Sequence, residues 1–216
     1  MLSTFLVMLT VVALYWFAVR RWFARWGTTP QDRTRVMPGD AVIINPMHSA
    51  THALTVAAPP EDIWPWLVQM GYRRGGLYSY DWLDRLFGYL DRPSANRVLP
   101  EFQNLAVGDV IPLGRGDGFP VTSIEPYRAL VLSGTNDGFQ WVWQFGLYPL
   151  DNDRTRLVSR GTQRFAKTIR WWLFMRVMEP AAFIMTRRML LGLKQRAEGL
   201  RARRVSETSD SHRAAA

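Results

Sequence analysis

The 216-residue sequence contains no cysteine and only three histidines, His48, His52 and His212. The lack of cysteine excludes a disulfide scaffold, an iron–sulfur cluster, a thiolate nucleophile and every cysteine-based zinc site. His48 and His52 lie four residues apart without an acidic motif beside them, so we expect no metal site. No phosphate-binding loop and no Ser–His–Asp set is recognisable either, and we expect no cofactor.

The composition is that of a globular protein. Hydrophobic residues make up 48% of the chain and charged residues 21%, values far from those of a disordered protein. The length predicts one folded domain with appendages. Ten tryptophans predict large aromatic packing surfaces.

The net charge of +9 is concentrated in two segments of the chain. Residues 1–39 carry five arginines against one aspartate, and residues 160–204 carry twelve basic side chains against two glutamates. The stretch between them, residues 40–159, is mildly acidic, with nine arginines against thirteen acidic side chains. This distribution argues against a nucleic-acid-binding body and favours two basic segments beside a membrane.

Residues 1–19 have no charged side chain and are rich in apolar and aromatic residues. As a helix they would extend about 28 Å, close to the thickness of the hydrocarbon core of a bilayer. Arg20, Arg21 and Arg25 follow directly. Amphipathic aromatic residues gather at the same end: Tyr15, Trp16, Trp22 and Trp26. This pattern predicts a single transmembrane helix in the cell membrane, and the positive-inside rule places the rest of the chain in the cytoplasm.

Residues 1–19 have two alternative interpretations. A cleaved signal peptide would carry positive charge before the apolar run and a small-residue cleavage site after it, and the sequence has neither. A soluble, buried helix is the other alternative. We expect residues 20–39, which contain Pro30 and Pro38, to form a basic linker next to the membrane, and residues 205–216 to form a disordered tail.

The pattern of residues 40–204 predicts an α+β domain. A strand at residues 51–56 leads into a proline-initiated helix ending near Met70, and a second short helix is expected over residues 79–88. Period-two patterns then predict strands at residues 109–113, 119–124, 129–134, 139–147 and 154–165. The short turns between them, including Gly-Arg-Gly-Asp-Gly at residues 114–118, predict hairpins and an antiparallel sheet. A long amphipathic helix is expected over residues 168–204, with a kink or a break at Pro180.

A curved antiparallel sheet covered by one long helix is the helix-grip fold, and several segments also resemble a family with that fold. They resemble the SRPBCC superfamily (START-like), in its polyketide cyclase/dehydrase and lipid-transport branch. The resemblance is carried by AAPPEDIWPWLVQMG (57–71), GGLYSYDWLD (75–84), LAVGDVIPL (105–113), residues 139–160 and EPAAFIMTRRMLLGLKQRAE (179–198). It implies a cavity between the sheet and the long helix that holds an apolar small molecule. It does not imply a reaction, because one fold supports many chemistries.

The residues expected to bind the ligand are large apolar and aromatic side chains around this implied cavity: Trp66, Tyr78, Tyr80, Trp141, Trp143, Phe145, Met175, Met178 and Met185. Tyr78, Tyr80 and Asp81 are weak catalytic candidates, because a phenol and a carboxylate could orient or protonate a ligand carbonyl. In the alternative interpretation, Asp81 caps the second helix and the tyrosines pack with their hydroxyl groups at the rim.

Charge along one strand gives a further expectation. The arginines at positions 154, 156, 160 and 164 share one strand face, so we expect that face to be solvated, because an unpaired buried charge is costly. The alternative is an inward Arg160 that binds a ligand carboxylate, which would require a bulge. The arginines expected at an anionic membrane surface are Arg20, Arg21, Arg25, Arg187 and Arg188.

The long helix is expected to dominate local stability, because its apolar stripe would close the cavity against Trp141 and Trp143. Replacing Met178 of that stripe by aspartate is therefore expected to cost more stability than any surface change.

Together these patterns predict a membrane-anchored cytoplasmic domain that binds an apolar or amphipathic small molecule, lipid-like or polyketide-like. One alternative is a cyclase or dehydratase that uses the same cavity. Another is a membrane-tethered interaction module without a ligand. The cavity distinguishes them: convergent polar groups favour an enzyme, an apolar lining favours a carrier, and a collapsed core favours the interaction module.

Overall fold

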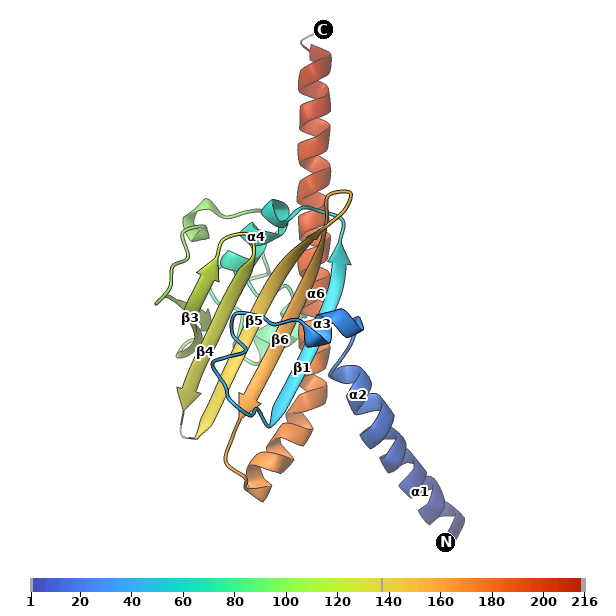
Figure 1. Ribbon diagram of the computed structural model, residues 1–216. Coiled ribbons are helices and arrows are strands. Elements are labelled where there is room, and N and C mark those ends of the chain that lie inside the picture. Colours follow the sequence, from blue (N-terminus) through green and yellow to red (C-terminus); the bar gives the residue numbers. More distant parts are fainter. Residues whose placement is uncertain (1, 137, 215–216) are drawn as a thin grey trace.

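The computed structural model describes residues 2–136 and 138–214 and has an α+β architecture (Figure 1). The N-terminal elements are α1 (Leu2–Leu14), the π-helix η1 (Tyr15–Val19), α2 (Arg20–Phe23) and α3 (Pro30–Thr34). The following elements are β1 (His48–Val56), α4 (Pro60–Val68), α5 (Asp81–Leu86), the 3₁₀-helix η2 (Pro100–Phe102), β2 (Val110–Leu113), β3 (Asp117–Glu125), β4 (Ala129–Asn136), β5 (Phe139–Leu150), β6 (Arg154–Arg164) and α6 (Ile169–Ala214). Residue 1 of the expected membrane helix and residues 215–216 of the expected tail lie outside the described residues.

The strands form one antiparallel six-stranded sheet in the order β1-β6-β5-β4-β3-β2. The glycine-rich segment 114–118 forms the predicted hairpin turn, and Leu113 pairs with Asp117 across it. β1 returns to the far edge and pairs with β6 over its whole length. The sheet lies in front of the long helix α6 in Figure 1. This arrangement fits the helix-grip fold predicted from the sequence.

The inner face of the sheet packs against α4 and α6 and forms the main hydrophobic core. Trp66 of α4, Leu130 of β4, Leu157 of β6 and Leu193 of α6 are all fully buried in it. α4 begins at Pro60, which suits a first helical turn because that position has no intrahelical partner for a backbone N–H. The core thus occupies one end of the space between sheet and helix.

The outer face of the sheet is covered by α3 and its flanking loops, within residues 28–47 (Figure 1). α3 starts with a capping box, in which the side chains of Thr29 and Asp32 each accept a hydrogen bond from the other residue's backbone N–H. Met37 packs in a small cluster with Ala53 and Val158, and Ile43 fills a second outer cluster. We expected residues 20–39 to be a linker, but their second half is part of the folded domain, because it covers apolar side chains of the sheet.

Buried ion pairs attach this cover to β6. Arg156 lies 2.6 Å from a carboxylate oxygen of Asp32, and Arg160 lies 2.6 Å from a carboxylate oxygen of Asp40. Arg160 also donates to Thr51 Oγ1 and to the carbonyl oxygens of Asp32 and Arg35. The expectation of a solvated arginine face was therefore wrong here, because acidic side chains and carbonyl groups satisfy the buried guanidinium groups. The alternative of an inward Arg160 was also wrong.

α6 is longer than the sequence indicated. It continues to Ala214, where we expected a disordered tail from residue 205. Pro180 lies inside the helix and does not end it, and helical residues continue on both sides. Figure 1 shows the first turns of α6, in orange, at an angle to the rest of the helix, as a kink rather than a break would produce.

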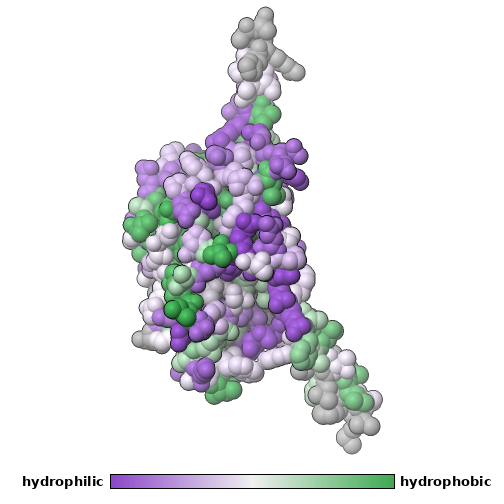
Figure 2. Space-filling view, viewed as in Figure 1, coloured by the Kyte–Doolittle hydropathy of each residue, from purple (hydrophilic) through white to green (hydrophobic). Residues whose placement is uncertain are grey.

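The N-terminal helical residues project from the domain (Figure 1). Leu6, Val7, Met8, Leu14 and Phe17 are exposed there. Figure 2 shows the outer face of the domain as largely hydrophilic, with hydrophobic surface on the projecting helix. Among the residues that the structure describes, no helix combines the length and the apolar character needed to cross a bilayer.

Candidate ligand cavity

A cavity of about 380 Å³ lies between the inner face of the sheet and the first third of α6. Its lining is mostly aromatic and apolar, with a few polar side chains from β1, β6 and α6. The apolar side chains are those of Phe23, Ala24, Ala50, Phe119, Phe139, Trp141, Val142, Trp143, Met175, Met178, Ala182 and Phe183, and Gly161 also lines it. The polar residues are His48, His52, Ser159, Gln163, Glu179 and Thr186. This size and chemistry are typical of a site for a small molecule.

The aromatic wall follows from the alternation of β5. Successive side chains of a strand point to opposite faces, so Phe139, Trp141 and Trp143 all point inward. Phe119 of β3 meets both tryptophans edge-on, with ring centroids 5.3 Å from Trp141 and 5.2 Å from Trp143. These edge-to-face contacts hold the rings in defined orientations. The wall is therefore a built surface of fixed shape.

The opposite wall is supplied by α6. Near the start of the helix, Trp171 stacks on Phe139, which lines the cavity, with ring centroids 5.2 Å apart. Met175 and Met178 lie one and two turns further along and line the cavity. Met178 is 41% exposed, so an aspartate there would reach water. The premise of the Met178→Asp expectation, that the new carboxylate would enter the core, was therefore wrong.

Polar groups gather on the β1 side of the cavity. His48 and His52 share the inward face of β1, and His52 Nε2 lies 2.8 Å from the carbonyl oxygen of Phe23. Because a carbonyl only accepts, this nitrogen carries the proton. Gln163 Oε1 is buried and accepts no hydrogen bond from any residue within the described chain. The side-chain amide of Gln163 thus presents an unused acceptor beside the cavity.

Burial is the largest influence on the two histidines and lowers the pKa of each. Arg20 and Arg176 lower the pKa of His48 further, while Glu179 raises it. The hydrogen bond to Phe23 raises the pKa of His52 but does not outweigh its burial. Both imidazoles are therefore neutral at pH 7, since the neutral form is the one that burial favours.

Glu179 of α6 is buried at the polar end of the cavity and binds α2. Arg20 Nε and Nη2 donate to its two carboxylate oxygens over 2.7 and 3.2 Å. Arg176 Nη1 adds a third contact at 3.4 Å. Both guanidinium groups also stack on Trp16, at 4.7 and 5.0 Å from its ring centroid. The carboxylate is thus satisfied by a bidentate partner, and it holds the N-terminal helical segment against α6.

The structure brings some of the residues predicted for ligand binding together and separates others from them. Trp141, Trp143, Met175 and Met178 line the cavity. The remaining predicted residues are not in its lining: Trp66, Tyr78, Tyr80, Phe145 and Met185. Trp66, Tyr78 and Phe145 are fully buried in the main core instead. Their contribution to ligand binding stays a prediction.

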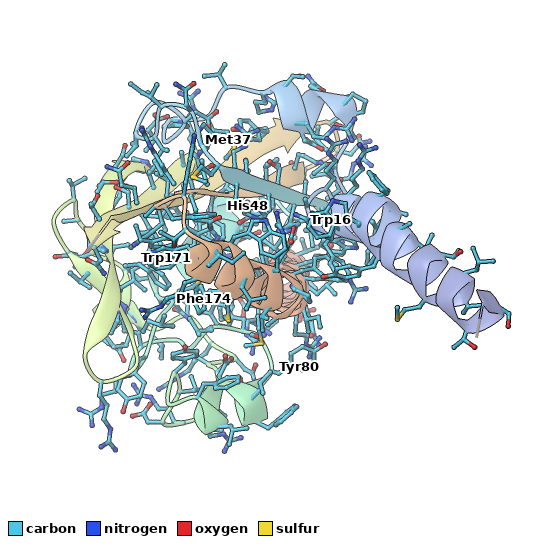
Figure 3. The ribbon with its side chains drawn as sticks, turned by 90° about the horizontal axis from the view of Figure 1, so that it is seen from below. Trp16, Met37, His48, Tyr80, Trp171 and Phe174 are labelled. Carbon is cyan, nitrogen blue, oxygen red and sulfur yellow. The ribbon has the colours of Figure 1, made fainter. Side chains whose placement is uncertain are left out.

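The catalytic candidates are also apart from the cavity. Figure 3 shows Tyr80 on the far side of α6 from His48 and the sheet. Burial raises the pKa of Tyr78 well above its usual value, so its phenol is a poor proton donor. Asp81 accepts hydrogen bonds from the backbone N–H and the hydroxyl group of Ser94, at 3.0 and 2.6 Å. It therefore anchors the loop at Ser94, and its side chain does not cap α5.

Sequence reasoning considered His48 and His52 only as metal ligands, and it did not place Gln163, Phe119 or Phe183 in a site. The sequence did contain a signal for His48, His52 and Gln163. His48 and His52 are four residues apart in a strand, and Gln163 pairs with His48 across β1 and β6. Period-two alternation and the pairing of the strands place all three on one face.

The arginines predicted at a membrane surface occupy two kinds of environment. Arg21, Arg25, Arg187 and Arg188 are exposed. Arg187 and Arg188 also stack on Trp26 and Tyr80, at 5.1 and 5.8 Å. Arg20 is committed to Glu179 within the protein. A role of these arginines at a lipid surface stays a prediction.

Comparisons with known proteins give similarity in structure only. A scan against protein-family models and a search of curated proteins each found no match. Among solved structures, the Aha1 dimer from Colwellia psychrerythraea is similar with 19% identity and a TM-score of 0.43, covering 70% of this chain and 97% of that chain. The KanY protein has 12% identity and a TM-score of 0.44, covering 72% and 99%. CalU16 from Micromonospora echinospora has 16% identity and a TM-score of 0.34, covering 71% and 86%. Similarity at this level assigns no function.

Proposed function

We propose that this protein binds an apolar or amphipathic small molecule in the cavity between the sheet and α6. The observation that carries the proposal is the cavity itself, about 380 Å³ with an aromatic wall on one side and two methionines on the other. Methionine adapts to varied apolar shapes because its side chain is unbranched and polarisable. The neutral His48 and the free acceptor of Gln163 suit a ligand whose apolar body carries a hydroxyl or another neutral donor.

The N-terminal helical segment is proposed to hold this domain at the cytoplasmic side of a membrane. Residues 2–19 carry no charged side chain, and Arg20, Arg21 and Arg25 follow them. Transfer of exposed apolar side chains such as Leu6, Met8 and Phe17 from water into lipid lowers the free energy. The Arg20–Glu179 pair fixes the end of this segment to α6 beside the cavity.

Native mass spectrometry of the full-length protein, purified in mild detergent, tests the binding proposal. We expect a co-purified molecule that is released on denaturation and identified in an organic extract. The matched variants are Gly161→Phe, which fills the cavity, and Gly116→Phe, which adds the same ring in the exposed β2–β3 turn. A Cβ at Gly161 meets no atom closer than 3.6 Å, so the backbone accepts the substitution.

Loss of the bound molecule in Gly161→Phe, with retention in Gly116→Phe, supports the cavity as the site. Equal retention in both variants contradicts it. Circular dichroism in the near ultraviolet is the folding control, because it reports whether the tryptophans keep their packing.

A second candidate function is proton transfer to or from a bound ligand, of the kind a cyclase or dehydratase requires. The observation that favours it is the imidazole of His48, which faces the cavity in its neutral, proton-accepting form. Under this proposal, His48→Gln retains the co-purified molecule but abolishes its conversion, which the mass of the extracted compound reports. An unchanged compound in wild type and variant alike favours binding alone.

A further inference from the structure

The first turns of α6 present an apolar face that no described residue covers. Ile169, Leu173, Phe174 and Val177 are 78%, 57%, 50% and 66% exposed. Ile169, Leu173 and Val177 lie four residues apart in succession, and Phe174 lies three residues before Val177, so the four side chains form one continuous strip along the helix. Trp171 lies nearer the sheet (Figure 3) and stacks on Phe139, and Phe174 meets the Trp171 ring edge-on with ring centroids 5.7 Å apart. Ile169–Val177 thus has one apolar face that packs and another that does not.

This strip is continuous with the N-terminal helical segment. Trp16 of η1 contacts Trp172 of α6, with ring centroids 6.0 Å apart. Arg176 lies between them, 5.0 Å from the ring of Trp16 and 5.3 Å from that of Trp172. Tryptophan and arginine gathered beside exposed apolar side chains are typical of the boundary between lipid and water.

Exposed cations lie at the start of the strip and on the N-terminal segment, and their charge is complementary to that of an anionic lipid surface. Lys167 and Arg170 are exposed at the start of α6, and Arg21 and Arg25 are exposed on the neighbouring N-terminal segment. Each basic side chain near an anionic leaflet contributes about 1 kcal/mol of attraction. An aqueous protein partner would have to match both the apolar strip and this cationic border, whereas an anionic bilayer supplies both.

From these observations we propose that the strip Ile169–Val177 inserts into the headgroup region of an anionic membrane, as a second contact beside the N-terminal segment. The inference deepens the proposed function. Met178, next to the strip, both lines the cavity and is 41% exposed, so the cavity opens beside the inserted face. An apolar ligand therefore passes between bilayer and cavity without crossing bulk water.

The test uses the absence of cysteine from the chain, since any introduced cysteine is unique. Full-length Leu173→Cys and Val177→Cys carry a nitroxide label and are reconstituted in vesicles of phosphatidylcholine and phosphatidylglycerol. The control is Ala202→Cys, which is exposed about 40 Å further along the same helix. Collisions with oxygen, which concentrates in lipid, are compared with collisions with a water-soluble nickel chelate.

We expect the ratio of oxygen to nickel collisions at positions 173 and 177 to exceed that at position 202 several-fold. A ratio equal to the control overturns the proposal, because it places the strip in water. Low collision rates with both reagents also overturn it, since they indicate cover by protein, such as a second copy of the chain.

A label at Leu6→Cys reports the N-terminal segment separately. If that label lies in lipid while positions 173 and 177 lie in water, the membrane anchor stands and the inserted strip is refuted. Native mass spectrometry on the same preparation measures ligand retention. It therefore tests the binding proposal separately from the membrane anchor and from the inserted strip.

Discussion

The two parts of α6 that face the sheet differ in what they contact. The first part, residues 169–186, leaves apolar side chains exposed and lines a cavity with side chains between Met175 and Thr186. In the second part, Met189, Leu190, Leu193 and Ala197 are buried in the main core. Both parts carry an apolar stripe of the same helical period, so the pattern alone does not separate them. The difference shows that the same stripe does two things: its second part fills the core, and its first part borders an open cavity.

The difference in packing between the two parts of α6 is tested by shortening one buried and one cavity-lining side chain. We expect Leu193→Ala to lower the free energy of unfolding by about 2–5 kcal/mol, because it leaves a void in a packed core. Met178→Ala should cost less than about 1 kcal/mol, because its side chain is already half exposed beside a cavity. Urea denaturation followed by tryptophan fluorescence measures both, and equal losses would mean that the two parts are packed alike.

The ion pair between Glu179 and Arg20 joins the first part of α6 to α2. Glu179→Gln is expected to cost about 1.5–3 kcal/mol, because it leaves two partly buried guanidinium groups without their counter-charge. The matched control in the second part is Glu198→Gln, whose partner Lys194 is more exposed, and it should cost less than about 1 kcal/mol. Thermal unfolding of the three proteins in the same detergent checks the ranking.

Two glycines of the second part sharpen the comparison further. A Cβ at Gly192 would lie 2.2 Å from the carbonyl oxygen of Tyr78, whereas the nearest atom to a Cβ at Gly199 is 3.8 Å away. Gly192→Ala is therefore expected to destabilise the protein by about 1–3 kcal/mol, although alanine has a higher helix propensity than glycine. Gly199→Ala should stabilise it by up to about 1 kcal/mol. If both changes stabilise in urea denaturation, close packing of α6 on Tyr78 is disproved.

The smallest expected effect is a dependence on pH that originates at the cavity. Burial lowers the pKa of His48 and of His52, so the folded state binds protons less readily than the unfolded state. Their contribution to stability is fully present above the unfolded value of about 6.5 and is lost as pH falls through the lower folded values. The double change His48→Gln and His52→Gln should flatten the unfolding free energy between neutral and mildly acidic pH. A wild-type slope that persists in the double variant assigns the effect to other groups.

Most of the fold was predictable because it rests on local rules. Alternation along residues 139–147, the turn residues between strands and the paired prolines before α4 each specify their element with little help from the rest of the chain. The outer cover was not predictable in this way. Residues 28–47 look like a linker because Pro30, Pro38 and the charges are typical of one, and only the three-dimensional fold shows that Asp32 and Asp40 meet the arginines of β6.

The candidate site also has one part that sequence patterns predict and one part that depends on tertiary packing. Trp141, Trp143, Met175 and Met178 were predicted around the cavity that the family resemblance implied, and they line the cavity of the structure. Tyr78 and Phe145 have the same chemical character, yet they lie in the filled end of the same interior. Which end is filled depends on how α4 packs against α6, a long-range contact that no pattern within one segment reports.

The outer cover has a mechanical consequence. A flexible tether of some twenty residues would let a domain tumble at the end of its anchor, and the orientation of the cavity would be random. Here the segment between α2 and β1 is held on the sheet by the ion pairs of Arg156 and Arg160. The carbonyl groups of Ala24 and Trp26 accept hydrogen bonds from β1, and that of Gly27 accepts one from Arg156, so the start of the segment is bonded to the sheet as well. A rotation of the N-terminal helix is therefore passed directly to the sheet, and the orientation of the cavity is coupled to the orientation of that helix.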